Sequence, residues 1–292
     1  MDLFLHLLIS GLANGAIYAS LALAIVMVHK SMGQVNFAQG EMAMFSTFIA
    51  WYLMSLGLPY IAAFFITLFI SFLMGLFIEY FIFRRLPDAS PLTTFMVILG
   101  AFSGFNGLAM LLFGTDMRTF PSPLKGITIL DNPYISLHEI AIFVVIALLF
   151  LVTATFFKKT RVGLGIRAAA INRESSLLSG IHVEWMLGLG WGIATTIGAV
   201  SGILVAPRIF LDPNMMGAVL LYSIAGAILG GLNSEFGAII GGFIVGVLEN
   251  MVANYIPFVG NDLKLTVALV VIVMVSIFKP EGLFGKSTVE RV

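Results

Sequence analysis

The chain has 292 residues, of which 60% are hydrophobic and 10% are charged, and its mean hydropathy is +1.06. A soluble domain carries about 25% charged residues because its surface faces water, so this composition excludes a water-soluble protein and predicts lipid contact. The 15 Lys and Arg residues balance the 15 Asp and Glu residues and indicate no nucleic-acid or acidic partner. The absence of Cys excludes a disulfide framework, a thiolate metal site and a Cys nucleophile.

The apolar segments predict nine membrane-spanning helices. A spanning helix needs about 20 apolar residues, and such segments lie at residues 3–28, 37–56, 60–83, 92–113, 137–157, 185–206, 215–231, 236–255 and 263–278. The first segment is too long for the apolar region of a signal peptide, so we expect it to stay in the membrane. Segments 37–56 and 215–231 are short and either cross fully or form half-helices that line a cavity. The predicted fold class is an all-α integral membrane protein, a polytopic helical bundle with eight to ten crossings.

The basic residues predict the orientation, because short loops rich in Lys and Arg stay in the cytoplasm. With the N-terminus outside, the cytoplasmic side receives eleven of them, namely Lys30, Arg84, Arg85, Lys158, Lys159, Arg161, Arg167, Arg173, Lys279, Lys286 and Arg291. The outer side receives four, namely Arg118, Lys125, Arg208 and Lys264. This split requires an odd number of crossings and a cytoplasmic C-terminus. We expect one transmembrane domain over residues 1–292, with a cytoplasmic segment at 158–184 and a larger external loop at 114–136.

Polar side chains inside the predicted spans are candidates for a translocation pathway. An ionisable group at mid-bilayer costs about 2.5–3.5 kcal/mol on insertion scales, so it usually faces a cavity or a partner. Glu41 lies one turn inside its segment and either caps the N-terminus of that helix or lines the route. Glu79 lies near Arg84, which favours a role at the cytoplasmic interface. The pathway candidates are Asn14, Asn36, Gln39, Glu41, Asn106, Glu249 and Asn250.

Glycines four residues apart predict close helix packing in the C-terminal half of the chain. Small residues let membrane helices approach closely, because lipid gives apolar helices no other reason to associate. Smooth glycine faces would also let helices slide when a gate alternates. The predicted packing positions are Gly226, Gly230, Gly237 and Gly241.

The sequence shows no set of residues that would carry enzyme chemistry. The tail from Pro280 to Ser287 is similar to a phosphate-binding loop, but Pro280 occupies the place of the first Gly, and a membrane segment precedes it in place of a strand. The four His residues lie near span ends or in loops, and none forms a metal-ligand pair with a Glu. We therefore expect no catalytic residue, no metal and no bound cofactor in this chain.

Residues 160–181 form the most clearly patterned segment between two predicted spans. One face of the predicted helix is apolar, Arg173 lies on the opposite face, and Gly180 can end the helix. The apolar positions are Leu164, Ala168, Ile171 and Leu178. The segment is too polar to span the membrane. It either lies on the membrane surface as an amphipathic helix or acts as a rigid lever that presses into a cytoplasmic partner.

Four stretches resemble the permeases of the branched-chain amino acid (LIV-type) family of ABC importers. The segment from Thr160 has the family's Thr-Arg-x-Gly opening, Arg-Ala pair and Gly-Ile close. Residues 36–41 resemble its Asn-Phe-Ala-His-Gly-Glu motif, and residues 230–238 resemble its Gly-Gly-x-Gly-Ser-x-x-Gly-Ala turn. Residues 280–285, Pro-Glu-Gly-Leu-Phe-Gly, resemble its C-terminal signature, which accounts for the false phosphate-binding loop.

Three positions depart from the family's pattern. Gln39 replaces the usual His, Asn233 replaces a Gly, and Ile171 stands where the family often has an acid. Gln39 changes the contacts open to the turn at Asn36, and Ile171 removes one polar contact to an ATPase. The fold that the resemblance implies does not depend on these three side chains.

The resemblance implies the permease subunit of an ATP-binding-cassette importer in the bacterial inner membrane, a transport subunit and not an enzyme. Its implied partners are a second homologous permease, two cytoplasmic ATPase subunits that bind ATP and Mg, and a periplasmic substrate-binding protein. The implied solutes are branched-chain or other amino acids, moved by alternating access, with urea or short amides as the alternative. A stand-alone channel or ion-coupled carrier is a second alternative. Residues 158–184 would be the coupling segment, with Arg161, Gly165, Arg167, Ala168, Asn172, Glu174, Gly180 and Ile181 contacting or supporting the ATPase.

Overall fold

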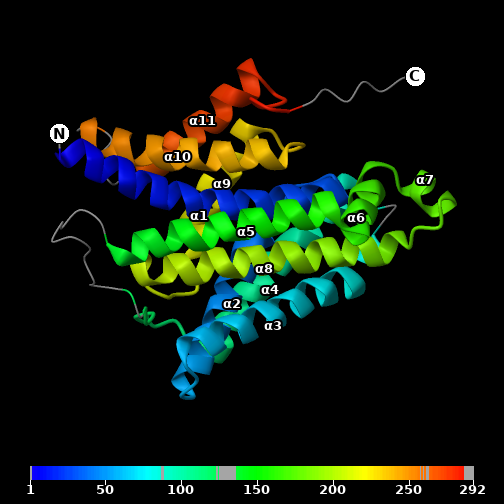
Figure 1. Cartoon of the computed structure of the whole chain (residues 1–292), viewed down its shortest axis with the longest axis horizontal. Coiled ribbons are helices and arrows are strands. Elements are labelled where there is room, and N and C mark those ends of the chain that lie inside the picture. The colour runs from blue at the N-terminus through cyan, green and yellow to red at the C-terminus, as the bar shows by residue number, and fades with distance from the viewer. Residues whose placement is uncertain are drawn as a thin grey trace. The chain divides into compact units, whose positions relative to one another are not determined.

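A computed structural model describes residues 2–86, 89–122, 124, 136–256, 258, 260 and 263–285. Helices joined by turns make up most of these residues (Figure 1). In chain order they are α1 (Asp2–Met32), α2 (Ala38–Ser55), α3 (Tyr60–Phe81), the 3-10 helix η1 (Phe83–Arg85), α4 (Pro91–Phe113), α5 (Leu137–Lys159), α6 (Arg161–Ile171), α7 (Arg173–Leu178), α8 (Val183–Ile209), α9 (Met216–Gly230), α10 (Glu235–Tyr255) and α11 (Lys264–Phe278). The predicted all-α fold is confirmed for the described residues.

Each of the nine predicted spans coincides with a helix of the described residues. Six of these helices, α1, α3, α4, α5, α8 and α10, are long and apolar enough to cross a membrane. α9 and α11 have 15 residues each, or about 22 Å of helix, which is shorter than a hydrocarbon core of about 30 Å. α2 has 18 residues, but Gln39 and Glu41 lower its hydropathy. The number of crossings and the orientation of the termini therefore stay predictions.

The helices group into two compact units that interleave along the chain. Unit 1 comprises Met1–Val26, Leu124–Phe143 and Ala218–Val292, and so holds most of α1, the start of α5, and α9 to α11. Unit 2 comprises Met27–Pro123 and Val144–Gly217, and so holds α2 to α4, most of α5, and α6 to α8. The sequence predicts one transmembrane domain and does not indicate this division, because no linker separates the two units.

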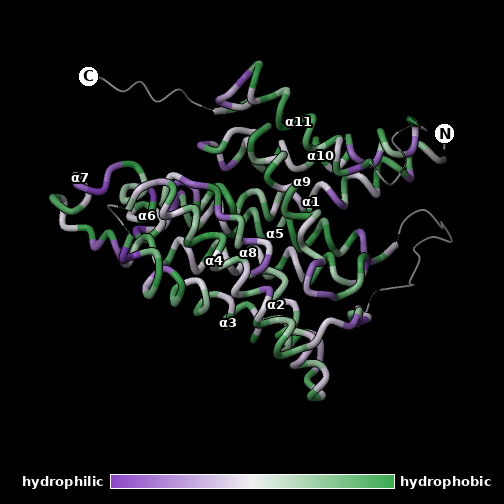
Figure 2. The backbone as a smooth tube through the Cα atoms, turned by 180° about the vertical axis from the view of Figure 1, so that it is seen from behind, coloured by the Kyte–Doolittle hydropathy of each residue, from purple (hydrophilic) through white to green (hydrophobic). Residues whose placement is uncertain are grey.

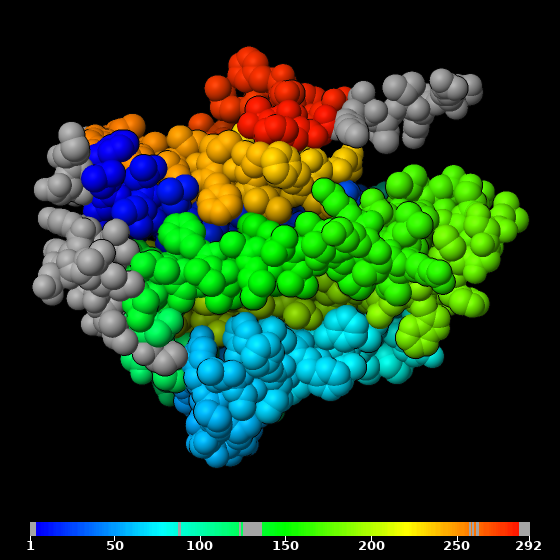
Figure 3. All heavy atoms as spheres, in the orientation of Figure 1, coloured from blue at the N-terminus to red at the C-terminus, as the bar shows by residue number. Residues whose placement is uncertain are grey.

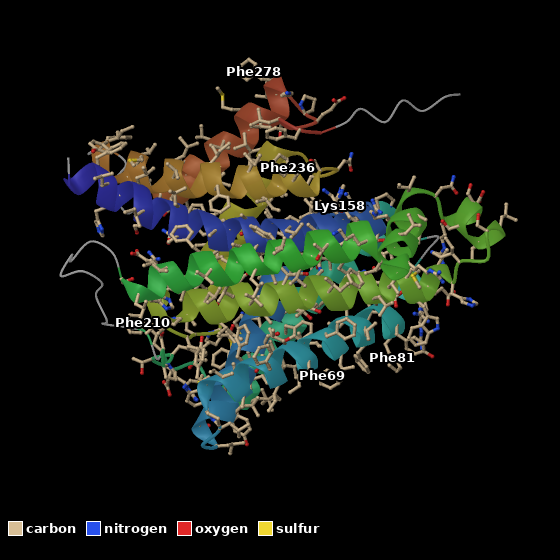
Figure 4. All side chains as sticks on the ribbon, viewed as in Figure 1. Phe69, Phe81, Lys158, Phe210, Phe236 and Phe278 are labelled. Carbon is tan, nitrogen blue, oxygen red and sulfur yellow. The ribbon has the colours of Figure 1, made fainter. Side chains whose placement is uncertain are left out.

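Unit 2 is organised around α8, which packs on α2 and α3. In the most apolar 18-residue stretch of each helix, 83% of α8 is buried but only 11% of α4. α3 keeps exposed apolar side chains along its outer side, including Phe69 and Phe81 (Figure 4). Figure 2 shows hydrophobic residues along α3 and hydrophilic residues around α7. An apolar surface of this extent fits a helix that faces lipid, since soluble monomers rarely expose such patches.

Hydroxyl and amide groups fasten α2 and α3 to each other and to α8. Oγ of Ser71 on α3 donates to Oγ of Ser46 on α2 at 2.8 Å. Oγ1 of Thr195 on α8 donates to the carbonyl oxygen of Ser71 at 2.8 Å. Nε2 of Gln39 on α2 donates to the carbonyl oxygen of Ala194 on α8 at 2.9 Å. Each such bond between membrane helices contributes about 0.6 kcal/mol, so together they fix the register of the three helices.

Unit 1 brings α1, α9 and α10 together through glycines. A Cβ atom on Gly226 of α9 would lie 2.7 Å from the Cα atom of Gly242 on α10. A Cβ atom on Gly15 of α1 would lie 2.9 Å from the Cα atom of Phe243 on α10. Both distances are too short for a side chain, so the backbones touch directly. The four predicted packing glycines, Gly226, Gly230, Gly237 and Gly241, all lie at the contact between α9 and α10.

Residues 280–285, which we call the C-terminal clasp, hold the turn between α9 and α10. The backbone N–H groups of Leu283 and Phe284 donate to the carbonyl oxygens of Leu229 and Gly230 at 2.8 and 3.0 Å. These two oxygens end α9 and have no partner within their own helix. The clasp therefore caps the C-terminal end of α9. Its backbone N–H groups, which in a phosphate-binding loop would bind a nucleotide, are used for this cap.

Several predicted features lie outside the described residues. They are Lys125 and most of the external loop, together with Lys286 and Arg291 of the tail. In the described start of that loop, Arg118 and Leu211 exchange backbone hydrogen bonds of 2.9 and 2.8 Å. This antiparallel bridge ties the segment after α4 to the segment after α8.

Candidate functional site

The coupling segment is anchored to the rest of unit 2 by α6. Oγ1 of Thr160 accepts a hydrogen bond from the N–H of Gly163 at 2.9 Å and caps α6. A Cβ atom on Gly163 would lie 2.5 Å from the carbonyl oxygen of Phe156, so α6 folds back tightly on the end of α5. α6 also packs on α8, where Gly165 lies against Met186. α6 is therefore a fixed support for the residues that follow it.

The helix is interrupted at Asn172, between α6 and α7, so the prediction of one continuous helix is wrong. Asn172 is extended, with φ −150° and ψ 105°, and its side-chain oxygen accepts from the N–H of Ser175 at 2.8 Å. Gly180 follows the short helix α7 with φ +77°, a conformation that favours glycine. An Asn side chain competes for backbone N–H groups and favours a cap over a helix interior. The apolar residues of α6 and α7 consequently do not share one helical face.

The coupling segment leaves large apolar side chains exposed. Ile171 is 86% exposed and Leu178 is 91% exposed, and Leu164 and Leu177 are also exposed. Figure 3 shows the segment as a projection at one end of unit 2. Exposed apolar groups with polar neighbours mark sites of contact with a protein or a membrane. The segment therefore presents a contact surface on a fixed support.

The remaining predicted coupling residues differ in exposure. Arg161 and Glu174 are exposed, Ala168 and Ile181 are half-buried, and Gly165 is buried. Arg167 is half-buried, and its Nε atom is enclosed without a hydrogen-bond partner from any described residue. Arg167 thus belongs to the support of the segment more than to its exposed surface.

Glu41 and Asn106 meet where α2 contacts α4. Nδ2 of Asn106 donates to Oε2 of Glu41 at 3.1 Å. The same amide lies 2.9 Å from the carbonyl oxygen of Pro213 and 3.4 Å from Oδ1 of Asn214. Asn106 lies 15 residues after the first residue of α4, about 22 Å along the helix. Its contact with Glu41 is therefore far from the first turn of α4. Glu41 is 2% exposed, whereas Asn106 is half-buried and Asn214 is exposed. Asn106 therefore connects a buried carboxylate to the surface.

α4 presents small residues on one face. Gly100, Ser103, Gly104 and Gly107 follow the i, i+3, i+4, i+7 spacing of a helix face, and all four are exposed. No atom of the described chain outside the local helix lies within 4 Å of a Cβ atom built on any of the three glycines. Gly100 and Gly104 therefore do not pack against another described helix of this chain. We call these four residues the α4 glycine face.

Asn36 and Gln39 are enclosed at the entry to α2. Both are 0% exposed. Oδ1 of Asn36 accepts from the N–H of Ala38 at 3.1 Å, but its Nδ2 atom has no partner among the described residues. Gln39 bonds to α8 through Nε2, while its Oε1 atom has no partner in the part of the chain that the structure describes. Buried polar atoms are usually paired, so this turn keeps unused hydrogen-bonding capacity beside the helix that carries Glu41.

Glu249 and Asn250 lie in a separate polar group in unit 1. Oη of Tyr18 on α1 donates to Oε2 of Glu249 at 3.0 Å, and Nζ of Lys264 lies 3.8 Å from Oε1. Nδ2 of Asn250 donates to the carbonyl oxygen of Leu7 at 2.6 Å. Glu249 and Asn250 are 5% and 7% exposed. These contacts fasten α10 to α1 and α11, and a place for either residue on a translocation pathway stays a prediction.

The sequence did not identify the partners in these two groups. Tyr18, Lys264 and Asn214 come from segments far from the residues they contact, so spacing alone carries no signal for them. Asn14, the remaining pathway candidate, is half-buried on α1. In the part of the chain that the structure describes, no group of three or more His, Cys, Asp and Glu side chains could hold a metal ion.

The chain matches a known family over most of its length. The family model described as "Branched-chain amino acid transport system / permease component" matches residues 7–276. BraD of Pseudomonas aeruginosa, a high-affinity branched-chain amino acid transport system permease protein, is 28% identical over 99% of this chain and 98% of the relative. LivH of Escherichia coli K12, which has the same description, is 26% identical with the same coverage. A probable LivH of Methanocaldococcus jannaschii is 23% identical over 91% of this chain and 87% of the relative.

A solved structure has a similar fold. PsaBC from Streptococcus pneumoniae, in complex with Fab, matches with a TM-score of 0.53 and 14% identity, over 93% of this chain and 91% of that chain. At this identity the likeness shows the fold alone. The family match and the six long apolar helices together define a multi-pass membrane protein with a transport role and no catalytic one. The chain belongs to the branched-chain amino acid transport system permease family, as a LivH-like subunit of an ABC transporter.

Proposed function

We propose that this chain is one permease subunit of an importer that moves branched-chain or other amino acids across the bacterial inner membrane by alternating access. Two cytoplasmic ATPase subunits would bind ATP and Mg, a second homologous permease would complete the pathway, and a periplasmic binding protein would deliver the solute. Support for the solute comes from the relatives, whose names specify branched-chain amino acids. Support for the mechanism comes from the two surfaces that unit 2 leaves open.

The exposed coupling segment is the observation that carries this proposal. An ATPase groove could bury Ile171 and Leu178, and each such side chain contributes about 1.5–3 kcal/mol when fully buried. The tight contact at Gly163 would then pass movement of the ATPase to α5, and the packing of α6 would pass it to α8. Nucleotide can drive this change only through a difference in affinity between the two states.

The α4 glycine face is the proposed contact with the second permease and the border of the route. Membrane helices associate through small residues, whereas lipid gains nothing from them. Asn106 adjoins Gly107 of this face, its amide donates to Glu41 and Pro213, and Asn214 beside it is exposed. A polar route between two permeases would hydrate the exposed Asn214, with Asn106 and the buried carboxyl group of Glu41 behind it.

The proposed topology has nine crossings, with the N-terminus outside and the C-terminus in the cytoplasm. The coupling segment and the C-terminal clasp then lie in the cytoplasm, and the turn at Asn214 lies outside. α2, α9 and α11 would cross where neighbouring helices shield their ends, since backbone in the membrane needs partners from protein or water.

Single-cysteine labelling tests this topology directly, because the natural chain has no Cys. Ser179 and Asn214 are both exposed in turns. In sealed cells an impermeant maleimide should label N214C from outside and leave S179C unlabelled until the membrane is opened. Labelling of S179C from outside would refute a cytoplasmic coupling segment and with it the proposed docking of the ATPase.

Docking is tested with Leu178→Asp and the neighbouring control Ser179→Asp. Both variants add one negative charge to the end of the segment, but only the first removes an exposed apolar group. Loss of about 1.5–3 kcal/mol should reduce ATPase co-purification with Leu178→Asp by about tenfold or more, while Ser179→Asp should keep it. Equal retention by both variants would show that the apolar surface does not bind the ATPase.

A further inference from the structure

Unit 2 contains a cavity of about 530 Å³ at the end that carries the coupling segment. Its walls come from the end of α1 and the turn after it, the end of α3 with η1, the start of α4, the first residue of α7 and the first turns of α8. Small-molecule sites occupy about 300–1,000 Å³, so the cavity has the size of such a site. We call it the inner pocket.

The charged groups of the inner pocket balance one another. Glu79 and Glu184 supply two carboxylates, and Arg84 and Arg173 supply two guanidinium groups. Nη2 of Arg84 lies 2.9 Å from Oε2 of Glu79, and its Nη1 lies 3.5 Å from Oε2 of Glu184. A simple anion would meet two carboxylates here, and a simple cation would meet two guanidinium groups. A ligand with one charge of each sign matches the pocket best.

The floor of the inner pocket is apolar and aromatic. Trp191 is 2% exposed, and Phe83 stacks on it with the ring centroids 4.5 Å apart. Leu187 lines the same cavity. A pocket with an apolar wall and a few convergent polar groups orients a ligand that has both parts. A free amino acid with an apolar side chain has an ammonium, a carboxylate and such a part.

The position of the pocket connects its ligand to transport. Arg173 belongs to α7 in the coupling segment, whereas Glu79 lies on α3 and Glu184 on α8. A ligand that contacts Arg173, Glu79 and Glu184 together would connect α7 to the C-terminal end of α3 and the N-terminal end of α8. If the ATPase must move α7 relative to these helices, a ligand that binds one arrangement better opposes the other.

We propose that the inner pocket binds a free apolar amino acid from the cytoplasm and thereby slows import when that amino acid has accumulated. This inference rests on the proposed function for its orientation and its class of solute. It assigns a second solute site, separate from the route along the α4 glycine face.

The binding test uses the complex of permease and ATPase subunits in phosphatidylcholine nanodiscs, without the binding protein, and radiolabelled leucine as the probe. Ala89 lines the pocket, whereas Leu92 lies nearby on the first turn of α4, does not line the pocket and is 65% exposed. Leucine should bind the natural complex and the Leu92→Trp control. Binding should fall at least about fivefold with Ala89→Trp, which fills the cavity, and with Glu184→Gln, which removes one carboxylate.

The transport test uses the complete importer in proteoliposomes with leucine inside or outside. Millimolar internal leucine should slow initial uptake by about fivefold, the lower range of allosteric coupling, and Ala89→Trp should abolish this inhibition without changing uptake into empty vesicles. Leucine binding that Ala89→Trp leaves unchanged overturns the proposal. So does co-purified phosphatidylethanolamine that Ala89→Trp removes while leucine does not bind, because the zwitterion would then be a lipid headgroup. An importer that does not move leucine refutes the proposed solute, while the binding test still decides whether the pocket takes it.

Discussion

Replacing one glycine of the C-terminal clasp tests whether the clasp holds unit 1 together. Gly282 has φ +78°, and a Cβ atom on it would lie 2.7 Å from the carbonyl oxygen of Ile228. Gly57, in the turn between α2 and α3, has φ +92°, and no described atom beyond its two chain neighbours lies within 4 Å of its Cβ position. Gly282→Ala and Gly57→Ala therefore share the cost of a left-handed backbone, and only Gly282→Ala adds a clash.

The expected difference follows from these geometries. The left-handed conformation costs a non-glycine residue roughly 1–2 kcal/mol, and the smaller unfolded-state entropy of Ala offsets part of it equally in both variants. In Gly282→Ala the clasp must also move and lose the hydrogen bonds from Leu283 and Phe284. Each bond contributes about 0.5–1.5 kcal/mol, so Gly282→Ala should lose about 1–3 kcal/mol more than Gly57→Ala.

Thermal unfolding of both variants in nanodiscs measures the difference, and hydrogen exchange locates it. The amides of Leu283 and Phe284 should exchange faster in Gly282→Ala and remain protected in Gly57→Ala. If the two variants unfold together and the clasp amides stay protected in both, the clasp does not cap α9 as the geometry requires. The reasoning would then be refuted even if both variants were destabilised.

Three further predictions concern other parts of the chain. Glu41→Gln and Glu249→Gln should keep most of their ATP-driven uptake after ion gradients are collapsed; loss of uptake only on collapse would favour an ion-coupled carrier. Gly226→Ala should lower stability by about 1–3 kcal/mol, because its Cβ atom meets the backbone of α10, whereas Gly100→Ala should leave the isolated chain unchanged in thermal unfolding. Asn172→Ala should cost about 1 kcal/mol of local stability by removing the α7 cap, seen as faster proteolysis of the coupling segment, and an unchanged rate would contradict the cap.

Local features of the sequence predicted the helices well. Apolar segments located the nine described helices that coincide with predicted spans, because a membrane helix is defined by its own composition. Glycine spacing located Gly226 and Gly241, because small residues must lie where helices touch. The break at Asn172 could also have been predicted, because Asn is a preferred N-cap residue whose side chain accepts from the N–H three residues later, here that of Ser175. The helical periodicity of the neighbouring Leu164 and Ile171 obscured it.

Contacts between distant segments could not be predicted. The clasp joins Leu283 to Leu229, and Tyr18 reaches Glu249 across 231 positions of the chain. The buried position of Glu41 could not be predicted either. Its place at the start of α2 suggested a helix end, but α2 begins beside the middle of α4, next to Asn106. Only the packed structure distinguishes these cases, because one sequence carries no record of which helices are neighbours.

The open surfaces of unit 2 explain why a partner is needed. The α4 glycine face forms no contact within the described chain, and Asn106 and Asn214 bring amides beside it. The exposed Asn214 needs water or protein as a partner, and a shallow glycine surface gives lipid tails no packing gain over another helix. A second permease with water between the two subunits satisfies both needs with the same surface. Because Glu41 lies directly behind Asn106, any solute that displaced that water would pass an amide backed by a buried acid. The same small residues that make the single chain incomplete therefore place the polar route at the subunit contact.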